Sequence, residues 1–416
     1  MVEGKIIQFY RQHRNINQSD LGEGICSATH ISKIERGLTE VSDQTITLIA
    51  DRLNINMEDE IKKFMSLERL LNDWFQSIIM KIAVKADRIK EQLEEIPFIH
   101  LSNFVHLYTL ILTKYYLLNN NEKLAKINIK NIEQTKALSE FEKNLHLHNK
   151  AIFQLKFKND YVEAISLLKQ INTTEYDNKE FYYDLASAYH YKNSRVLAFY
   201  YGNKALQFFT ESQCFSRMIE AENLMLVQLE ETDKSNTSDK DYYRLIELSS
   251  QYGLNNQMST LYHNLAYHQL LNDQYKEASV YYKKSMQLKD KDTKNYLLSL
   301  EGYINSMTKG KLIPNKDLLP LVEKGLLLAE RIESQMHIHI FKLHQFTLLN
   351  LENEYFHYLE TEALPYYYKI GITDAIEHYQ LKLFDYYMEK QNRIKADEYA
   401  KKLLNKFRNN NSNPFV

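Results

Sequence analysis

The sequence predicts an all-α protein in which a small N-terminal bundle of helices precedes a long array of repeated helix pairs, wound into a right-handed superhelix. The 416 residues include only ten Gly and five Pro, so residues that interrupt helices are rare. A pattern of two short helices, each with one apolar face, recurs through most of the chain, and no region is rich in strand patterns. We expect the bundle to occupy residues 1–66 and the array residues 67–416.

The first sixty residues predict five short helices with start and stop signals. Asn17 is the expected N-cap of the second helix, with Asp20 three positions later to complete the capping pattern. Ser27 opens the third helix, and Gly37 closes it because glycine readily adopts the left-handed conformation that ends a helix. The predicted helices are, in order, 3–13, 17–25, 28–36, one from Ser42 and one from Met57.

The spaced motif in this segment resembles the Cro/CI-type helix-turn-helix domain of bacterial and phage repressors over residues 5–55. Its members are Arg11, Asn17 to Leu21, Ile31 to Gly37 and Leu48 to Ala50. The resemblance implies that the helix beginning at Gln18 crosses the phosphate backbone and that the helix from Ser27 to Arg36 is the recognition helix. It also implies an ion pair between Arg11 and Glu35 inside the domain.

The third helix also has the physical properties of a DNA-reading helix. Ile31 and Ile34 are expected to face the core, which leaves polar side chains on the opposite face. Basic residues gather in this segment, although the formal charge of the whole chain is only −2: Lys5, Arg11, Arg14, Lys33 and Arg36. We therefore predict double-stranded DNA as a partner. The candidate contacts are Gln18, Ser27, Ala28, Thr29, His30, Lys33 and Arg36. The alternative is a bundle that only caps the array with solvated polar side chains.

The clearest copy of the repeated unit runs over residues 261–288. Small Ala266 and Ala278 are expected where the two helix axes approach closest, and Asn272-Asp273 is the expected break between them. This pattern resembles the tetratricopeptide repeat, in which each unit buries its apolar face against its neighbours. Roughly nine pairs fit between Trp74 and the C-terminus, at a spacing close to the ~34 residues of that repeat.

A few segments depart from the repeat pattern. Residues 231–240 are polar and predict a surface loop, and Gly310 to Pro314 with Leu319-Pro320 predicts an atypical turn. Cys26 and Cys214 are expected to be reduced core residues of a cytosolic protein. No apolar run of about 18 residues is present, so we expect a cytoplasmic protein without a membrane partner.

Motifs of enzymatic chemistry are missing from the sequence. Gly is too sparse for phosphate-binding loops, and no nucleophile elbow is present, so we predict neither a cofactor nor an enzyme. His337, His339 and His344 form the one cluster with metal-ligating side chains. Their spacing places the first two on different faces of a helix and the outer two about 10 Å apart along its axis, which excludes one shared ion. We expect surface or groove histidines.

The inner helix of each pair is expected to line a concave groove in which an extended peptide needs hydrogen-bond partners. Asn264, two positions before Ala266, offers both a donor and an acceptor. Comparable or neighbouring positions give three further candidate peptide contacts, namely Asp184, Asn223 and His268. The alternative for each is a solvated polar position on an inner helix.

A Cro/CI-type domain followed by these repeats resembles, over nearly the whole chain, the peptide-sensing regulators of low-GC Gram-positive bacteria, the Rgg, NprR, PlcR and PrgX group. Order and length are closest to the NprR branch. The resemblance implies a cytoplasmic transcription factor whose repeats bind a short re-imported signalling peptide, with Asn264 as the groove asparagine.

The predicted mechanism is that peptide binding changes the separation of two DNA-binding domains in a homodimer or tetramer. The resemblance further implies binding of a phosphorelay response regulator in the peptide-free state. The alternative from another class is a protein-interaction scaffold of the Rap type, whose array binds a signalling protein and whose bundle has no role at DNA.

Overall fold

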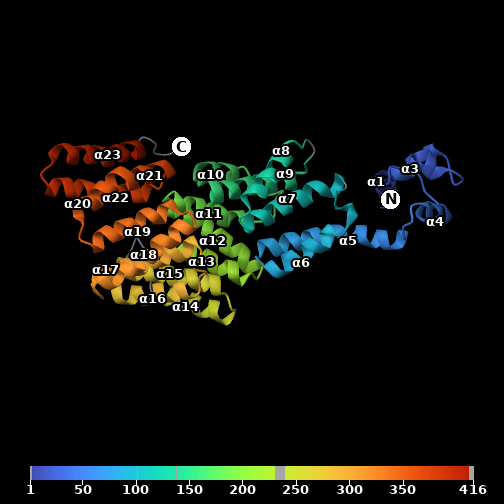
Figure 1. Cartoon of the computed structure of the whole chain (residues 1–416). Coiled ribbons are helices and arrows are strands. Elements are labelled where there is room, and N and C mark those ends of the chain that lie inside the picture. The colour runs from blue at the N-terminus through green and yellow to red at the C-terminus, as the bar shows by residue number, and fades with distance from the viewer. Residues whose placement is uncertain (1, 101, 136–137, 230–238, 412–416) are drawn as a thin grey trace. The chain divides into compact units, whose positions relative to one another are not determined.

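The computed structural model describes residues 2–100, 102–135, 138–229 and 239–411, and at 102–103, 373–374 and 405–411 it describes the backbone alone. All regular elements in these ranges are helices (Figure 1). The N-terminal elements are α1 Val2–His13, α2 Gln18–Gly22, α3 Ala28–Glu35, α4 Asp43–Arg52 and α5 Met57–Ile79. The elements that follow are α6 Ala83–Glu94, η1 Pro97–His100, α7 Ser102–Leu118, α8 Glu122–Glu133, α9 Glu140–Phe153, η2 Gln154–Lys158, α10 Tyr161–Lys169, α11 Phe181–Tyr191, α12 Arg195–Glu211 and α13 Phe215–Leu229. The last elements are α14 Asp239–Gln251, α15 Asn255–Leu271, α16 Tyr275–Gln287, α17 Lys294–Lys309, α18 Asn315–Arg331, α19 Gln335–Leu348, α20 Glu352–Tyr358, η3 Leu359–Ala363, α21 Leu364–Ile370, α22 Thr373–Glu389 and α23 Arg393–Asn411.

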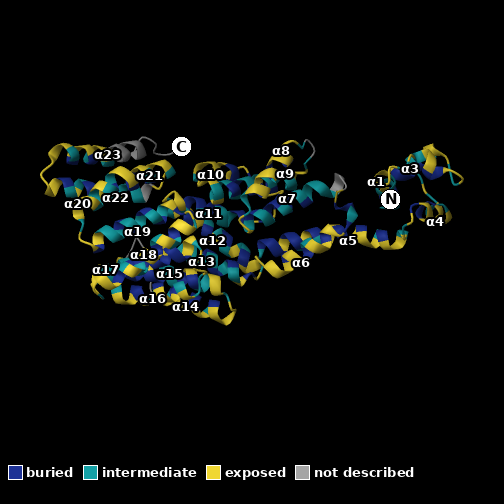
Figure 2. Ribbon diagram, in the orientation of Figure 1, coloured by how far each residue is buried: buried dark blue, intermediate teal, exposed yellow. Residues whose placement is uncertain are grey.

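The chain divides into two compact units, residues 1–228 and 229–416, and each is described by itself. In both units, buried residues lie on the facing sides of packed helices and exposed residues on the outer sides (Figure 2). The first unit holds α1–α13 with the N-terminal bundle, and the second holds α14–α23.

The N-terminal bundle has its own apolar core. This core consists of Ile7, Leu21, Ile31, Ile34, Ile49 and Leu53. Gly4 allows α1 to approach α3, because a Cβ at this position would lie 2.1 Å from the carbonyl oxygen of Ile34. The second helix is shorter than predicted, since it ends at Gly22 rather than at residue 25. The reason is Gly24, whose positive φ of 70° turns the chain out of the helix.

The described helices from α5 onward follow one another as nine consecutive pairs if α20, η3 and α21, which are continuous, count as one helix. Each of eight pairs lies within a single unit, whereas the ninth pair, α13 and α14, is split by the division between the units. Within the eight pairs, the turn passes through one residue in the left-handed conformation: Lys81, Asn120, Asn159, Asn193, Asp273, Lys311, Asn350 and Gln391. Asn and Asp tolerate this conformation best, which explains why the sequence signalled some of these turns and not others.

A fully buried alanine recurs near the start of the second helix in many pairs. It is the fourth residue of the second helix, and the full set, which includes the predicted Ala278, is Ala86, Ala125, Ala164, Ala198, Ala278 and Ala396. The first four follow at intervals of 39, 39 and 34 residues. The expected spacing of ~34 was therefore too short, because several helices in this chain extend beyond the usual repeat.

Two local expectations were wrong, and a third falls mostly outside the described residues. Pro320 lies inside α18 and not in a turn, because the chain already turns at Lys311 and the helix begins at Asn315. Cys214 is buried as expected, but Cys26 is only partly buried. The predicted loop 231–240 lies mostly outside the described residues, and its last two positions, 239 and 240, begin α14.

Candidate functional site

The candidate recognition helix α3 presents a polar face to solvent. The hydroxyl of Ser27 accepts a hydrogen bond from the backbone N–H of His30 at 3.2 Å, and Gly37 ends the helix with a φ of 66°. Ile31 and Ile34 are buried in the bundle core as predicted. The exposed candidates are Ser27, Ala28, Thr29, Lys33 and Arg36, whereas His30 and Gln18 are half-buried. This arrangement leaves one polar face of α3 exposed to solvent, as a helix that reads DNA requires.

A buried ion pair fixes α3 against α1. The guanidinium of Arg11 donates to both carboxylate oxygens of Glu35, at 2.5 and 3.0 Å, as the resemblance implied. Gln18 donates its amide N–H to Glu35 at 2.8 Å, so this candidate phosphate contact is engaged inside the bundle. The hydrogen bond to Glu35 is the largest influence on the pKa of Arg11 and raises it, although burial acts in the opposite direction, so the guanidinium stays charged.

The bundle is less basic than its sequence motif suggested. Residues 1–66 contain eight Lys and Arg against ten Asp and Glu, a net charge of −2. Arg11 is paired with Glu35. Lys5 lies over the ring of Phe64, and Arg14 lies over the ring of Tyr10. Of the five predicted basic residues, all but Arg11 are exposed, and two of these, Lys33 and Arg36, lie on or next to α3.

One residue of the bundle escaped the sequence reasoning. Arg52 of α4 donates to the carbonyl oxygens of Leu21 and Glu23, at 3.0 and 2.5 Å, and so satisfies the C-terminal end of α2. The local sequence around Arg52 does not predict this contact, because the acceptors lie about thirty residues earlier in the chain. Arg52 therefore positions the turn between α2 and α3.

The bundle also contacts the first helix pair within the first unit. The hydroxyl of Tyr10 donates to Glu60 of α5 at 2.8 Å. The rings of Phe9 and Tyr10 pack edge-on against Phe98 of η1, with centroids 5.1 and 5.8 Å apart. Phe64 packs on the same ring at 5.7 Å. These aromatic contacts connect the candidate DNA-binding segment to the beginning of the array.

Two candidate peptide contacts lie on α15 in the second unit. Asn264 is half-buried. His268 is buried, and its Nε2 lies 3.2 Å from the amide nitrogen of Asn272 and 3.7 Å from a carboxylate oxygen of Asp239. A peptide could reach His268 only after this packing changed.

The other two candidates lie in the first unit. Asn223 is half-buried on α13. Asp184 of α11 is engaged by His148 of α9, whose Nε2 lies 2.8 Å from the carboxylate. Burial lowers the pKa of His148, so the neutral ring donates from Nε2 to Asp184 and accepts from the hydroxyl of Tyr176 at Nδ1, 3.0 Å away. Asp184 is thus a partly exposed member of a larger polar cluster.

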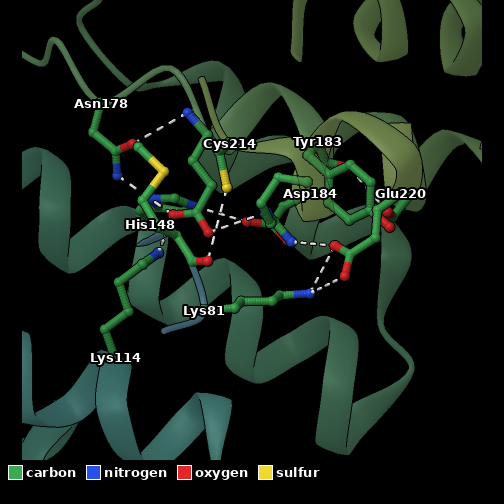
Figure 3. A network of polar contacts seen from close by, with 12 residues as sticks. Lys81, Lys114, His148, Asn178, Tyr183, Asp184, Cys214 and Glu220 are labelled. Carbon is green, nitrogen blue, oxygen red and sulfur yellow. Dashed lines mark hydrogen bonds and ion pairs between the residues drawn. The ribbon is translucent and has the colours of Figure 1, made fainter. Parts of the chain in front are cut away.

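This cluster is a chain of alternating charges (Figure 3). Lys114 of α7 lies 2.8 Å from Glu180, and Arg217 of α13 lies 3.1 Å from the other oxygen of the same carboxylate. Arg217 also contacts Glu220 at 2.7 Å, and Glu220 accepts from Lys81 at 2.8 and 3.0 Å. The cluster therefore joins the α5–α6 turn to α7, α11 and α13, segments up to 139 residues apart in sequence.

The protein interior sets the charge state of this cluster. Burial alone would raise the pKa of Glu180, but Lys114 and Arg217 outweigh burial and hold it below its usual value. For Asp184, burial also acts upward, and the hydrogen bond from His148 with the nearby cations makes the net pKa shift downward. Both carboxylates are therefore ionised at neutral pH. Sequence reasoning missed this cluster, although Lys114 is the sole Lys, Arg, Asp or Glu in the apolar sequence of α7.

The histidines of α19 make ordinary structural contacts. His337 and His339 are buried, so the expected surface or groove location was wrong for both. His337 bonds to the hydroxyl of Ser334 and His339 to that of Tyr358. Among the described residues, no group of three or more His, Cys, Asp or Glu is placed to hold a metal ion. Nor does any described helix have the length and apolar character needed to cross a membrane.

Fold and site together define a helix-turn-helix protein with an array of tetratricopeptide-type helix pairs. The helix-turn-helix family model matches residues 7–59. The transcriptional activator NprA of Geobacillus stearothermophilus is 21% identical over an alignment of 415 positions that spans 94% of this chain and 99% of that protein.

Two solved structures extend the comparison. A Rap protein complexed with competence and sporulation factor has a TM-score of 0.70 at 15% identity, covering 82% of this chain and 97% of that one. NprR in complex with its cognate peptide NprX has a TM-score of 0.65 at 20% identity, covering 82% and 99%. At these identities the likeness shows the fold. The predicted fold class and the resemblance to the peptide-sensing regulators, including the NprR type, are confirmed.

Proposed function

We propose that this protein is a quorum-sensing transcriptional regulator that binds double-stranded DNA through α3 and a short signalling peptide through its repeats. The observation that carries the proposal is the capped, exposed α3, locked by the Arg11–Glu35 pair, on the same chain as the helix pairs. The similarity to the activator NprA over nearly the full length supports the DNA-binding half. The similarity to NprR with its peptide supports the other half.

The mechanism follows from linkage. A peptide that spans several repeats binds best at one curvature of the array, so its binding favours that curvature. In a homodimer or tetramer the change alters the distance between two copies of α3, which must lie about 34 Å or a multiple apart to read two half-sites. Affinity for DNA then depends on the peptide. In the peptide-free state the array is free for another partner, a phosphorelay response regulator.

A gel-shift titration tests the DNA half. Labelled genomic fragments are titrated with full-length protein at about 150 mM salt, with unlabelled random-sequence duplex as competitor. We expect a subset of fragments to be retarded despite the competitor, and Lys33→Ala to weaken that retardation. Lys62→Ala is the matched control, because it also removes one exposed positive charge, but from α5 and not from α3. Equal retardation of every sequence would contradict the proposal.

Calorimetry tests the peptide half. Candidate short peptides are titrated into wild type, Asn264→Ala and the surface control Lys283→Ala, which changes an exposed side chain of α16. We expect Asn264→Ala alone to lose about ten-fold or more in affinity, the effect of removing one or two hydrogen bonds to a peptide backbone. Unchanged affinity would remove Asn264 from the site without affecting the DNA result.

The second candidate function is a scaffold of the Rap type. It is favoured by one observation, the net charge of −2 over residues 1–66, which suits a protein partner better than a phosphate backbone. The similarity to a Rap structure is consistent with it. If no genomic fragment competes better than random duplex, and the full-length chain instead retains a response regulator, this function replaces the first.

A further inference from the structure

Helix α1 contributes to two separate apolar cores of the first unit. Ile7 belongs to the core of the N-terminal bundle, together with Ile31 and Ile34 of α3. Its neighbour Ile6 belongs instead to the core of the array, in the cluster that contains Phe64 of α5. Both Ile6 and Ile7 are 0% exposed. Because consecutive residues of a helix point about 100° apart, α1 presents one face to the bundle and a second face to the array.

Two contacts at opposite ends of α1 fix this helix to α3. Near its start, Gly4 lies so close to α3 that a Cβ at this position would be 2.1 Å from the carbonyl oxygen of Ile34. Near its end, Arg11 donates to both carboxylate oxygens of Glu35, at 2.5 and 3.0 Å. Seven residues separate Gly4 from Arg11, about 10 Å along the helix axis. Contacts at two separated points prevent α1 from turning against α3, so the two helices move as one body.

Four aromatic rings fix α1 to the array, and we call them the aromatic cluster: Phe9 and Tyr10 of α1, Phe64 of α5 and Phe98 of η1. Phe98 is the centre of this cluster. Its side chain is 0% exposed, and the centroids of the other three rings lie 5.1, 5.8 and 5.7 Å away, each edge-on. Edge-on contacts favour a defined geometry, because the positive edge of one ring meets the negative face of another. The hydroxyl of Tyr10 adds a directional hydrogen bond to Glu60 of α5 at 2.8 Å.

The segment that joins the bundle to α5 also favours a fixed attachment. Ile55 of this segment and Met57, the first residue of α5, are half-buried. Each of them packs against both the core of the bundle and the core of the array. Segments that let two domains move independently are typically exposed and polar, with few contacts across them. An apolar segment that is packed on both sides holds the bundle against the first helix pair.

We propose that Phe98 is a positioning residue for the candidate recognition helix: through α1, it holds α3 in one orientation relative to α5. The bundle then moves with the first helix pair as a rigid body and is not a domain on a flexible tether. This inference rests on the proposed function and adds the route by which a change in the array reaches DNA. A shift of α5 or η1 turns α3 directly, whereas a flexible tether would absorb the shift.

The attachment is measurable in the full-length protein without any ligand. Spin labels are placed at Asp51→Cys on α4 and Glu91→Cys on α6, both exposed positions, after Cys26 and Cys214 have been changed to Ala. Pulsed electron paramagnetic resonance then gives the distribution of distances between the bundle and the first helix pair. We expect one narrow distribution in this labelled parent protein.

Two variants and one matched control test the role of the aromatic cluster. Phe98→Ala removes the central ring and should change the narrow distribution into a broad one. Phe9→Ala should broaden it as well, and it removes a half-buried ring that packs on the array core and not on the bundle core. Phe104→Ala is the control: its ring packs edge-on against Phe64 at 5.4 Å but contacts no ring of α1 among the described residues, so the distribution should stay narrow.

Thermal unfolding verifies that each variant is folded. A broad distribution in the labelled parent would overturn the inference, and so would a narrow one in folded Phe98→Ala. If Phe98→Ala does not fold, Phe9→Ala decides by the same criterion.

A DNA measurement separates this inference from the proposed function. Fragments retarded in the gel-shift titration are shortened to one or two half-sites and titrated with wild type and Phe98→Ala. We expect equal affinity for one half-site, because Phe98→Ala leaves α3 and the Arg11–Glu35 pair unchanged. On two half-sites we expect Phe98→Ala to lose about 10-fold or more, because a loosely held second α3 has a lower effective concentration at its half-site.

The outcomes are distinguishable. An equal loss on one and two half-sites would show a general structural role and would overturn the positioning role of Phe98. If wild type binds no specific fragment, the DNA-binding function fails, while the spin-label distances still decide whether Phe98 holds α3 in one orientation.

Discussion

Replacing Glu180 by Gln removes the one negative charge that Lys114 and Arg217 share. The side chains of Lys114, Arg217 and Glu180 are 4%, 3% and 8% exposed, so solvent cannot replace the lost carboxylate. Breaking a buried pair by removing one partner costs about 3–5 kcal/mol, because the remaining charge stays buried and unpaired. Lys114 loses its carboxylate partner, whereas Arg217 keeps Glu220 at 2.7 Å, and we expect a loss within that range.

The single tryptophan of the chain makes this loss measurable in the first unit alone. Trp74 lies fully buried on α5, with its ring stacked on Tyr108 at 5.6 Å. Urea unfolding of the full-length protein, followed by Trp74 fluorescence, should show a lower midpoint for Glu180→Gln at an unchanged slope. Glu175→Gln is the control, because Glu175 is exposed just outside the cluster and should change stability by less than about 0.5 kcal/mol.

A result below about 1 kcal/mol for Glu180→Gln, or one equal to that of Glu175→Gln, would refute this reasoning. It would mean that water reaches Lys114 and Arg217 in the folded protein.

Three further predictions concern the polar cluster of the first unit and the N-terminal bundle. Glu180 and Asp184 have pKa values below their usual range and His148 is held neutral, so the unfolded chain binds more protons in acid than the folded chain does. The urea midpoint followed by Trp74 fluorescence should therefore fall as the pH drops from 7 toward 4, and it should fall less steeply in Glu180→Gln. Gly4→Ala should destabilise the N-terminal bundle by about 1–3 kcal/mol or more through the clash with the Ile34 carbonyl. Gly22→Ala should cost less, because its nearest neighbour would be a side-chain carbon of Ile31 at 3.3 Å and the backbone atoms of Ser27 and Ala28 lie at ordinary contact distance; amide exchange in α3 compares the two variants. Ser27→Ala should cost about 1 kcal/mol by removing the N-cap of α3, seen as faster exchange of the His30 amide, and unchanged exchange would exclude a stabilising cap.

Local signals in the sequence were sufficient for much of the fold. Ser27 and Gly37 bound α3, and Ser42 caps α4, because caps and helix stops depend on residues three or four positions apart. The alanine and the Asn272-Asp273 turn identified the best helix pair for the same reason. Residues in the left-handed conformation that are not Asn, Asp or Gly, such as Lys81 and Lys311, carry no such signal.

The candidate sites depended on contacts that sequence spacing cannot reveal. Family resemblance supplied the Arg11–Glu35 pair, but nothing local predicted that Gln18 would bind the same carboxylate. The Lys81–Glu220 pair joins positions 139 residues apart, so only the folded chain brings them together. Asp184 was selected as a groove residue and is instead embedded in this cluster, while Asn264 remains a prediction.

The most direct measurement is chromatin immunoprecipitation of the native protein from its own cells at low and high density, in parallel with Lys33→Ala. Because both peptide-poor and peptide-rich conditions are sampled, we expect a defined set of sites that share one sequence motif, occupied at one density at least and lost in Lys33→Ala. A chain that occupies no reproducible site at either density, or the same sites without Lys33, would contradict the view that α3 reads DNA.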